Sequence, residues 1–260
     1  MGILNITPDS FHDGGKFDDV YNAQKQVEKI LSEGADIVDI GAISSQPGAK
    51  TISSKEEFAR LNNILPHLRK EFPKMIVSLD TYRSEIVKYM YEYYNINMVN
   101  DISSGDADNE MIETVAKLKI PYVAMHKKGN PENMQENPNY QNITTEILMY
   151  FGERISEMNR LGLNDIILDP GFGFGKTVNH NYELLKNVKE IKALGYPILV
   201  GISRKSMIYK VLDCLPKDSL IGTTVLNAVA LWQGADILRV HDVKEAVETV
   251  KLIGKLKETN

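Results

Sequence analysis

Polar side chains that could bind a ligand stand at or just beyond the ends of apolar runs along this chain. They are, in chain order, Asn5, Asp80, Asn100, His126, Asp169, Lys205, Arg239 and His241. Carboxylates and amides can pair with the N–H groups of a heterocycle, whereas lysine, arginine and histidine can bind phosphate or carbonyl oxygens. Each one alone has a structural alternative, namely a helix cap, a solvated charge or a satisfied core histidine. Their shared position at the ends of successive runs indicates a single polar site.

The stretch from residue 166 to residue 177 combines an acid with a flexible loop. An apolar run leads to Asp169, and a proline and three glycines follow, so the backbone can turn sharply and lie close to a ligand. A Walker A loop needs glycine where Pro170 stands, and the dinucleotide fingerprint needs G-x-G-x-x-G where this loop has G-x-G-x-G. Both nucleotide-binding motifs are therefore excluded. A strand-end carboxylate remains, beside a loop that carries Phe172 and Phe174.

Composition limits the class of protein. The net charge of −5 and the isoelectric point near 5.6 argue against a general binder of nucleic acid or anionic membranes, because both need a basic face. The single cysteine, Cys214, excludes an internal disulfide and a cysteine-based zinc site, and a core residue is a simpler interpretation of it than a nucleophile. The sequence has no apolar stretch of about eighteen residues and no leader pattern, so we expect a soluble cytoplasmic protein.

Eight apolar runs predict β-strands, and a helical pattern follows each of them. The strands are expected at residues 2–6, 37–43, 75–79, 98–102, 122–125, 166–169, 198–202 and 237–240. The helices are expected at residues 18–33, 54–71, 84–94, 109–118, 143–161, 181–194, 206–233 as a broken segment, and 243–256. Most of the strands are continuously apolar, which is typical of a parallel sheet covered on both faces.

These alternating elements predict an α/β fold, a single (β/α)8 TIM barrel that forms one domain over residues 1–260. No change of composition marks a linker between two smaller domains. A doubly wound open sheet is the alternative. In a barrel the carboxyl ends of all strands meet at one mouth, where loops build the active site, so the polar side chains would converge there.

Seven sequence blocks, spread over nearly the whole chain, resemble those of the dihydropteroate synthase family in type and order. They are M-G-I-L-N-I-T-P-D-S-F at 1–11, S-L-D-T at 78–81, N-D-I-S at 100–103, M-H at 125–126, D-P-G-F-G-F-G-K at 169–176, S-R-K-S at 203–206 and R-V-H-D at 239–242. Members of this family join a dihydropterin to p-aminobenzoate in folate biosynthesis and are targets of sulfonamides. The resemblance implies a transferase with a pterin-binding TIM barrel, Mg²⁺ as cofactor, a homodimer, and neither nucleic acid nor membrane as partner.

The resemblance also implies which residues bind the pterin. A pterin has a guanidine-like edge that a carboxylate can hold with two parallel hydrogen bonds, and Asp169 suits this role. Asp80 and Asn100 would bind other ring nitrogens. Lys205 would donate to the ring carbonyl and a ring nitrogen, and Met125 would also contact the substrate.

The catalytic residues implied by the resemblance handle the departing diphosphate. Arg239 would stack on the ring while facing phosphate, and His241 would bind the leaving group beside Asn5, the expected Mg²⁺ ligand. The aniline nitrogen of p-aminobenzoate is already a neutral nucleophile, so a strong general base is not required. Stabilising the departing charge and a cation on the pterin CH₂ carbon matters more. Asp13 would face that cation from the first loop, and Lys205 completes the catalytic set.

The p-aminobenzoate site would be built from three chain segments. The ring would lie between Phe174, Pro47 and the stem of Lys205. Its carboxylate would lie near Ser206 at a helix N-terminus, where free N–H groups favour an anion. Ser45 would supply the hydroxyl that the family usually has as threonine.

Gln46 departs from the family, which usually has arginine there, and so lacks a charge and a bidentate donor. One interpretation is that another cation replaces the missing arginine charge. The other is that the protein handles diphosphate or p-aminobenzoate less well and has an altered sensitivity to sulfonamides. Unchanged kinetics and sulfonamide inhibition in Gln46→Arg would exclude the second interpretation. Two other functions are open. A pterin-binding methyltransferase shares the Asp/Asn/Asp pattern but has no use for S-R-K-S or T-P-D-S-F. A non-catalytic pterin-binding paralogue is disfavoured by the intact Lys205, Arg239 and His241.

Overall fold

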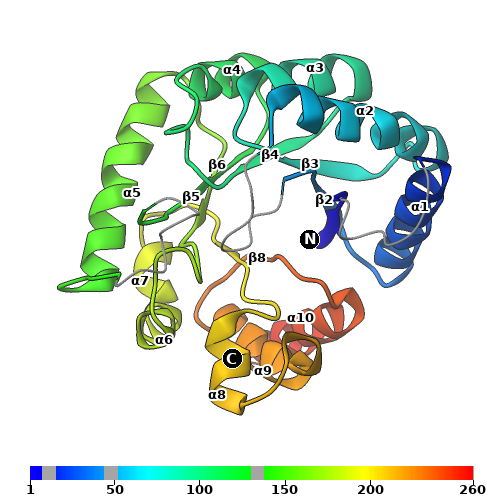
Figure 1. The fold of residues 1–260 in the computed structure, drawn as a ribbon. Coiled ribbons are helices and arrows are strands. Elements are labelled where there is room, and N and C mark those ends of the chain that lie inside the picture. Colours follow the sequence, from blue (N-terminus) through cyan, green and yellow to red (C-terminus); the bar gives the residue numbers. More distant parts are fainter. Residues whose placement is uncertain (8–15, 44–51, 130–137, 260) are drawn as a thin grey trace.

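Strands and helices alternate along the chain in the computed structural model, which describes residues 1–7, 16–43, 52–129 and 138–259 (Figure 1). The strands are β1 (Gly2–Asn5), β2 (Ile37–Gly41), β3 (Ile76–Asp80), β4 (Met98–Asp101), β5 (Tyr122–Met125), β6 (Ile166–Asp169), β7 (Leu199–Val200) and β8 (Ile237–Leu238). The helices are α1 (Lys16–Ser32), α2 (Ser54–Glu71), α3 (Ser84–Tyr94), α4 (Met111–Leu118), α5 (Ile143–Arg160), α6 (Val178–Lys186), α7 (Val188–Lys192), α8 (Ser206–Leu212), η2 (Pro216–Asp218), α9 (Leu220–Trp232) and α10 (Val243–Glu258). The helices surround the strands, as the α/β prediction requires.

The eight strands close into a parallel barrel. β1 to β6 form one sheet in chain order, and β7 pairs with β8. Two further bridges join these sheets, because Leu168 pairs with Ile198 and Gly2 pairs with Val240. The backbone N–H of Ile3 donates to the carbonyl of Val240 at 3.0 Å. The predicted TIM barrel is confirmed, and the open doubly wound sheet is wrong because the first strand bonds to the chain just after the last one.

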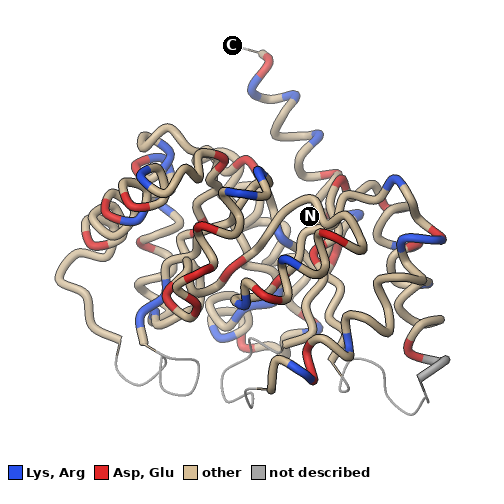
Figure 2. Tube along the Cα trace, turned by 90° about the horizontal axis from the view of Figure 1, so that it is seen from above, with Lys and Arg blue, Asp and Glu red and all other residues tan. Residues whose placement is uncertain are grey.

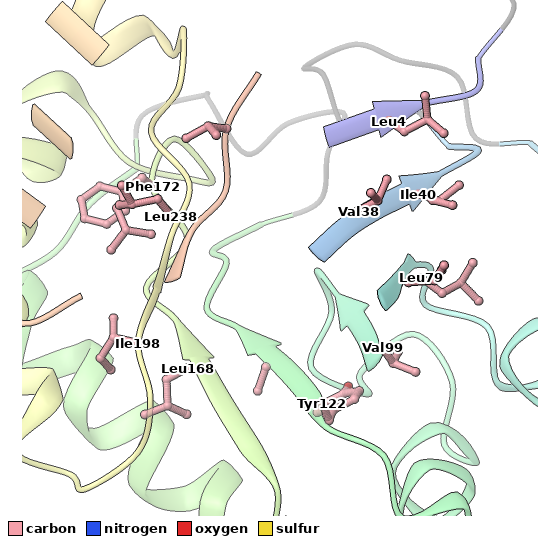
Figure 3. Packing of buried hydrophobic residues seen from close by; sticks show 14 of the residues in the cluster. Leu4, Val38, Ile40, Leu79, Val99, Tyr122, Leu168, Phe172, Ile198 and Leu238 are labelled. Carbon is pink, nitrogen blue, oxygen red and sulfur yellow. The ribbon is translucent and has the colours of Figure 1, made fainter. Parts of the chain in front are cut away.

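The register of the strands sorts their side chains into two layers. Asp39 of β2 lies beside Ser78 of β3, and two residues nearer the mouth Asp80 lies beside Asn100 of β4. These side chains point into the barrel, and their apolar neighbours point outward, because successive side chains on a strand alternate in direction. Figure 3 shows buried apolar residues of this outward layer together with Phe172, and the same core cluster includes apolar residues of the helices. A separate buried cluster fills part of the interior: Met98, Val123, Ile167 and Leu199.

Helix boundaries agree with the prediction at α2 and α3 and differ at the predicted helix 181–194. Thr177 and His180 form a capping box, in which each side chain pairs with the backbone N–H of the other residue. This box starts α6 at Val178, earlier than predicted. Asn187 then separates α6 from α7. The periodic apolar pattern therefore identified the helical region but not the break within it.

The outer helices carry charges of both signs. Figure 2 shows lysine and arginine interspersed with aspartate and glutamate along them. The last turns of α10 extend away from the rest of the molecule in this view. Within the described residues, no helix combines the length and the apolar character that a membrane span requires.

Candidate active site

Four polar side chains, which we call the polar floor, meet inside the mouth of the barrel around Arg239. Its Nε donates to Oδ2 of Asp39 at 2.7 Å, and its Nη2 donates to Oδ2 of Asp80 at 2.8 Å. Nδ2 of Asn100 donates to the same Asp39 oxygen at 3.1 Å. The structure thus brings three of the predicted site residues together. The fourth member, Asp39, was missed by the sequence analysis.

Burial and charge oppose each other in the polar floor. Burial raises the pKa of Asp80 to about 7, the Arg239 charge opposes this shift, and the charge of Asp39 adds to it. Burial alone would lower the pKa of Arg239, but the carboxylates of Asp39 and Asp80 raise it above its ordinary value. The guanidinium is therefore a permanent positive charge inside the mouth, whereas Asp80 can change its charge near neutral pH.

Asp169 is the last residue of β6, and Lys205 lies after β7, directly before the first residue of α8. Oδ1 of Asp169 accepts a hydrogen bond from the backbone N–H of Gly171 at 2.7 Å. Nζ of Lys205 donates to the carbonyl of Phe172 at 2.5 Å and lies 4.7 Å from the centre of the Phe174 ring. Burial raises the pKa of Asp169 against the opposing charge of Lys205, and burial lowers the pKa of Lys205 to about 8. Both predicted residues thus face the site with their charges close together.

Lys176 is a buried residue that fixes the glycine-rich loop by hydrogen bonds to its backbone carbonyls. This side chain is only 3% exposed, and its Nζ donates to the carbonyls of Gly171 at 2.8 Å and Phe174 at 3.1 Å. The same Nζ lies 3.0 Å from Nδ1 of His126. Burial and then the charge of Lys176 lower the pKa of His126 to about 2, so its ring is neutral. His126 therefore supports the loop as a buried core histidine, the structural alternative named for it above.

Gly171 allows this loop to pass very close to the neighbouring strand. Its φ is 70°, a left-handed conformation that side chains rarely adopt. A Cβ atom at this position would lie 1.8 Å from the carbonyl oxygen of His126. The close approach places the Gly171 N–H on Asp169. The first glycine of the motif is therefore required by space as well as by backbone conformation.

His241 lies on the rim of the mouth after β8. Its Nδ1 is 3.0 Å from Oγ of Ser203, and Nε of the neighbouring Arg204 donates to Asp242 at 3.0 Å. Desolvation, followed by the positive charges of Arg239 and Arg204, lowers the pKa of His241 to about 4. The neutral imidazole can therefore donate one hydrogen bond and accept another at neutral pH.

The remaining predicted residues occupy different environments. Asn5 is exposed at the end of β1, Met125 is buried at the end of β5, and Ser206 is half-buried as the first residue of α8. Four residues discussed from the sequence lie outside the described residues: Asp13, Ser45, Gln46 and Pro47.

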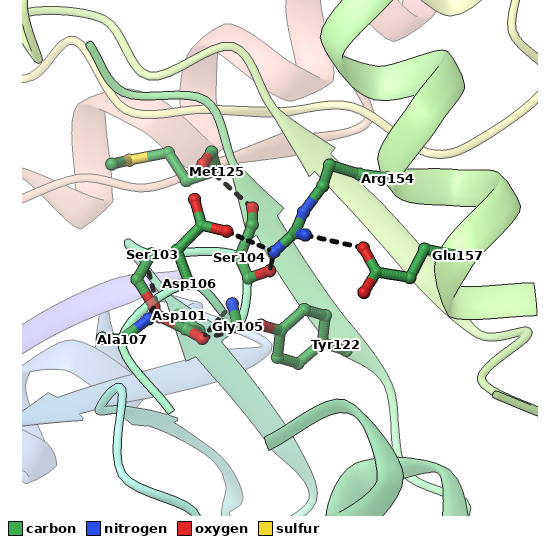
Figure 4. Close-up of polar contacts among 10 residues, drawn as sticks. All are labelled: Asp101, Ser103, Ser104, Gly105, Asp106, Ala107, Tyr122, Met125, Arg154 and Glu157. Carbon is green, nitrogen blue, oxygen red and sulfur yellow. Dashed lines mark hydrogen bonds and ion pairs between the residues drawn. The ribbon is translucent and has the colours of Figure 1, made fainter. Parts of the chain in front are cut away.

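Asp101 follows Asn100 in β4 and points to the opposite face, because successive side chains on a strand alternate in direction. Figure 4 shows Asp101 among the polar groups of the following loop and Tyr122. Its two carboxylate oxygens accept hydrogen bonds from Ser103, from the N–H of Gly105 at 2.9 Å and from the Tyr122 hydroxyl at 2.6 Å. Burial raises the pKa of Asp101, and these donors oppose the shift. Every accepted bond ties β4 to its own following loop or to β5. Asp101 therefore shapes the loop beside the site and does not face the mouth.

Comparisons with known proteins agree with this geometry. The family model described as "Pterin binding enzyme" matches residues 1–241, so the fold and the site define a pterin-binding barrel enzyme. The dihydropteroate synthase of Haemophilus influenzae is 42% identical over 256 residues, covering 97% of this chain and 91% of that protein. The Clostridium difficile dihydropteroate synthase structure with pteroic acid has a TM-score of 0.91 at 36% identity, covering 98% and 95%. The Xanthomonas albilineans enzyme with 4-aminobenzoic acid has a TM-score of 0.90 at 31% identity, covering 100% and 93%.

The chain belongs to the dihydropteroate synthase family. It is a transferase that condenses (7,8-dihydropterin-6-yl)methyl diphosphate with p-aminobenzoate, giving 7,8-dihydropteroate and diphosphate. The resemblance inferred from the seven sequence blocks is confirmed. The methyltransferase and non-catalytic alternatives are therefore set aside.

Proposed function

We propose that the pterin ring binds over the polar floor, with Asp169 holding its guanidine-like edge. The observation that carries this proposal is the free side of the Asp169 carboxylate. Oδ1 is occupied by the Gly171 N–H, whereas Oδ2 accepts no hydrogen bond from the described residues. Asp80 and Asn100 supply further polar atoms for the ring nitrogens, and the Lys205 ammonium supplies donors for the ring carbonyl.

The same arrangement suits loss of diphosphate followed by amine attack. Arg239 and Lys205 provide positive charge at the mouth, and the neutral His241 on the rim can donate a hydrogen bond to a phosphate oxygen. The carboxylates beneath the ring would stabilise a cation that develops on the CH₂ carbon. Asp13 stays a prediction for contact with that cation, because it lies outside the described residues.

The p-aminobenzoate is proposed to lie beside the glycine-rich loop. The Lys205 ammonium already rests on the Phe174 ring, so this aromatic face and the Lys205 stem form one wall. Ser206 stands next along the chain, on the first turn of α8. The bound 4-aminobenzoic acid of the Xanthomonas albilineans structure supports a site for this ligand in the fold. Ser45 and Pro47 are the expected contacts from the second loop.

The residues at the mouth fit a magnesium ion that is held mainly by the substrate. No group of three or more acidic, histidine or cysteine side chains suited to a metal occurs within the described part of the chain. Asn5 is exposed at the end of β1, and the described residues offer its side-chain amide no hydrogen bond. Magnesium favours oxygen ligands, keeps several waters and bridges phosphates, so one amide oxygen is a sufficient protein ligand. The bound ion would neutralise charge on the departing diphosphate.

A homodimer is proposed through the exposed face of α9. Four large apolar side chains lie along it at helical spacing: Ile221 at 79% exposure, Val225 at 55%, Val229 at 38% and Trp232 at 55%. Such a continuous exposed apolar face marks an interaction surface. A second copy is the partner that the family resemblance supplies. Light scattering should show a dimer for the wild type and a monomer for Ile221→Glu, and a monomeric wild type would reject the proposal.

A cytoplasmic location stays a prediction.

Two assays test the proposed roles together. Dihydropteroate and diphosphate should form only when both substrates and Mg²⁺ are present. Asp169→Asn should weaken binding of the pterin substrate by about 10- to 100-fold, because it loses charge-assisted hydrogen bonds. Asp165→Asn is the matched control, because Asp165 is exposed just before the opposite end of β6. Equal pterin affinity in the Asp169 and Asp165 variants would contradict the proposed orientation of the ring.

A further inference from the structure

Asp39 lies one inward-facing layer below the groups of the polar floor that face the mouth. In the register of β2 and β3 it stands beside Ser78, two residues before the level of Asp80. Its side chain has no exposed surface, whereas the side chains of Asp80 and Arg239 are 14% and 19% exposed. A ligand entering from the mouth therefore meets Arg239 and Asp80 before it could reach Asp39.

A single oxygen of Asp39 orients donors from two distant strands. Oδ2 accepts both the Nε–H of Arg239 and the amide N–H of Asn100. Asp80 holds a second edge of the same guanidinium, so two separate carboxylates fix the plane of Arg239. Its Nη1 donates to none of the described residues. The orientation of both Arg239 and Asn100 thus depends on Asp39.

The other oxygen of Asp39 is unusual for a side chain with a purely structural role. Oδ1 is buried and has no hydrogen-bond partner among the described residues, and the same holds for Oγ of Ser78 beside it. A buried polar atom without a partner lowers stability, and native proteins contain few of them. A carboxylate retained here at such a cost is better explained by what it does for the site than by its contribution to the core.

We propose that Asp39 is a positioning residue of the pterin site. It holds the Arg239 guanidinium and the Asn100 carboxamide in the orientation that the ring requires, and it does not contact the ring itself. This inference rests on the pterin-binding roles proposed above for those two residues. Replacing Asp39 should therefore weaken pterin binding because Arg239 and Asn100 lose their orientation, and not because a direct contact between Asp39 and the pterin is lost.

The test compares Asp39→Ala and Asp39→Asn with Ser78→Ala by titration calorimetry with the pterin substrate and by thermal unfolding. Asp39→Ala should weaken pterin binding by about 10- to 100-fold, by analogy with the loss of affinity when the outer partner of a metal ligand is removed. Asp39→Asn keeps a hydrogen-bond acceptor and the side-chain shape, so this variant should lose less pterin affinity, but a measurable amount. If Asp39→Ala does not fold, Asp39→Asn is used for the test in its place. Ser78→Ala, in the same buried layer, should bind as the wild type does.

A double-mutant cycle separates positioning from general disruption of the core. If Asp39 acts through Arg239, Asp39→Ala should weaken pterin binding much less in an Arg239→Ala background than in the wild type. Equal losses in both backgrounds would overturn the inference, and so would wild-type affinity in both Asp39 variants. A wild-type protein that does not bind the pterin substrate would instead refute the proposed function, and the inference with it.

Discussion

Replacing Gly171 with alanine tests whether the close approach of the glycine-rich loop to β5 builds the site. An alanine at φ 70° is strained by about 1–2 kcal/mol in any surroundings. Here its Cβ would also lie 1.8 Å from the carbonyl oxygen of His126, so the loop must move. That movement would stretch the hydrogen bonds from Gly171 to Asp169 and from Lys176 to Gly171. We expect Gly171→Ala to lower the free energy of unfolding by about 4 kcal/mol or more in total.

Gly195→Ala is the matched control for this substitution. Gly195 has a φ of 86°, but an added Cβ there would meet nothing within 4 Å, so only the backbone strain applies. In a protein of this size each kcal/mol lowers the melting temperature by about 2–4 °C, so calorimetry should show a drop of roughly 2–8 °C for Gly195→Ala and of 8 °C or more for Gly171→Ala. Pterin affinity should fall only in the Gly171 variant. Equal drops with unchanged affinity would refute this explanation of the loop.

Three further predictions concern pH. The pKa of Asp80 is about 7 in the folded protein and exceeds its ordinary value of 3.8, so between these pH values the folded state binds a proton that the unfolded state has lost. The free energy of unfolding should therefore fall as the pH rises from about 4 to about 7. Urea denaturation over this pH range should show that Asp80→Asn removes the fall. The pKa of Lys176 is about 7 in the folded protein, below its ordinary value of 10.5, so between these pH values the unfolded state binds the extra proton. The free energy of unfolding should therefore rise from pH 7 to pH 10 by up to about 1.4 kcal/mol per pH unit. A rise of the same size in Lys176→Met would contradict the assignment of this rise to Lys176. Turnover should decline above pH 8 as the Lys205 ammonium loses its proton, and initial rates of Lys205→Arg, weaker overall, should keep a flat alkaline profile.

The sequence predicted the barrel well because most of the buried strands are nearly continuous apolar runs, and a polar residue stands at or just beyond the end of many of them. Asp39 was missed because an acid within such a run has no visible partner, and its partner Arg239 is 200 residues away. Lys176 resembles a solvated charge at the end of its loop, and its burial depends on His126 from the preceding strand. The roles of such residues depend on which strands become neighbours, and local patterns do not contain that information.

The first strand meets the segment just after the last strand at the closure of the barrel, and this affects the order in which the site can form during synthesis. Ile3 bonds to Val240, and Arg239 reaches back to Asp39, so a chain still growing on the ribosome lacks the pterin site until its last strand has emerged. Joining segments so far apart in sequence is slow, because a long loop must be ordered first. Because the proposed pterin site includes Arg239, the pterin would bind only the closed barrel. It would then stabilise finished molecules against unfolding and would not assist those still folding.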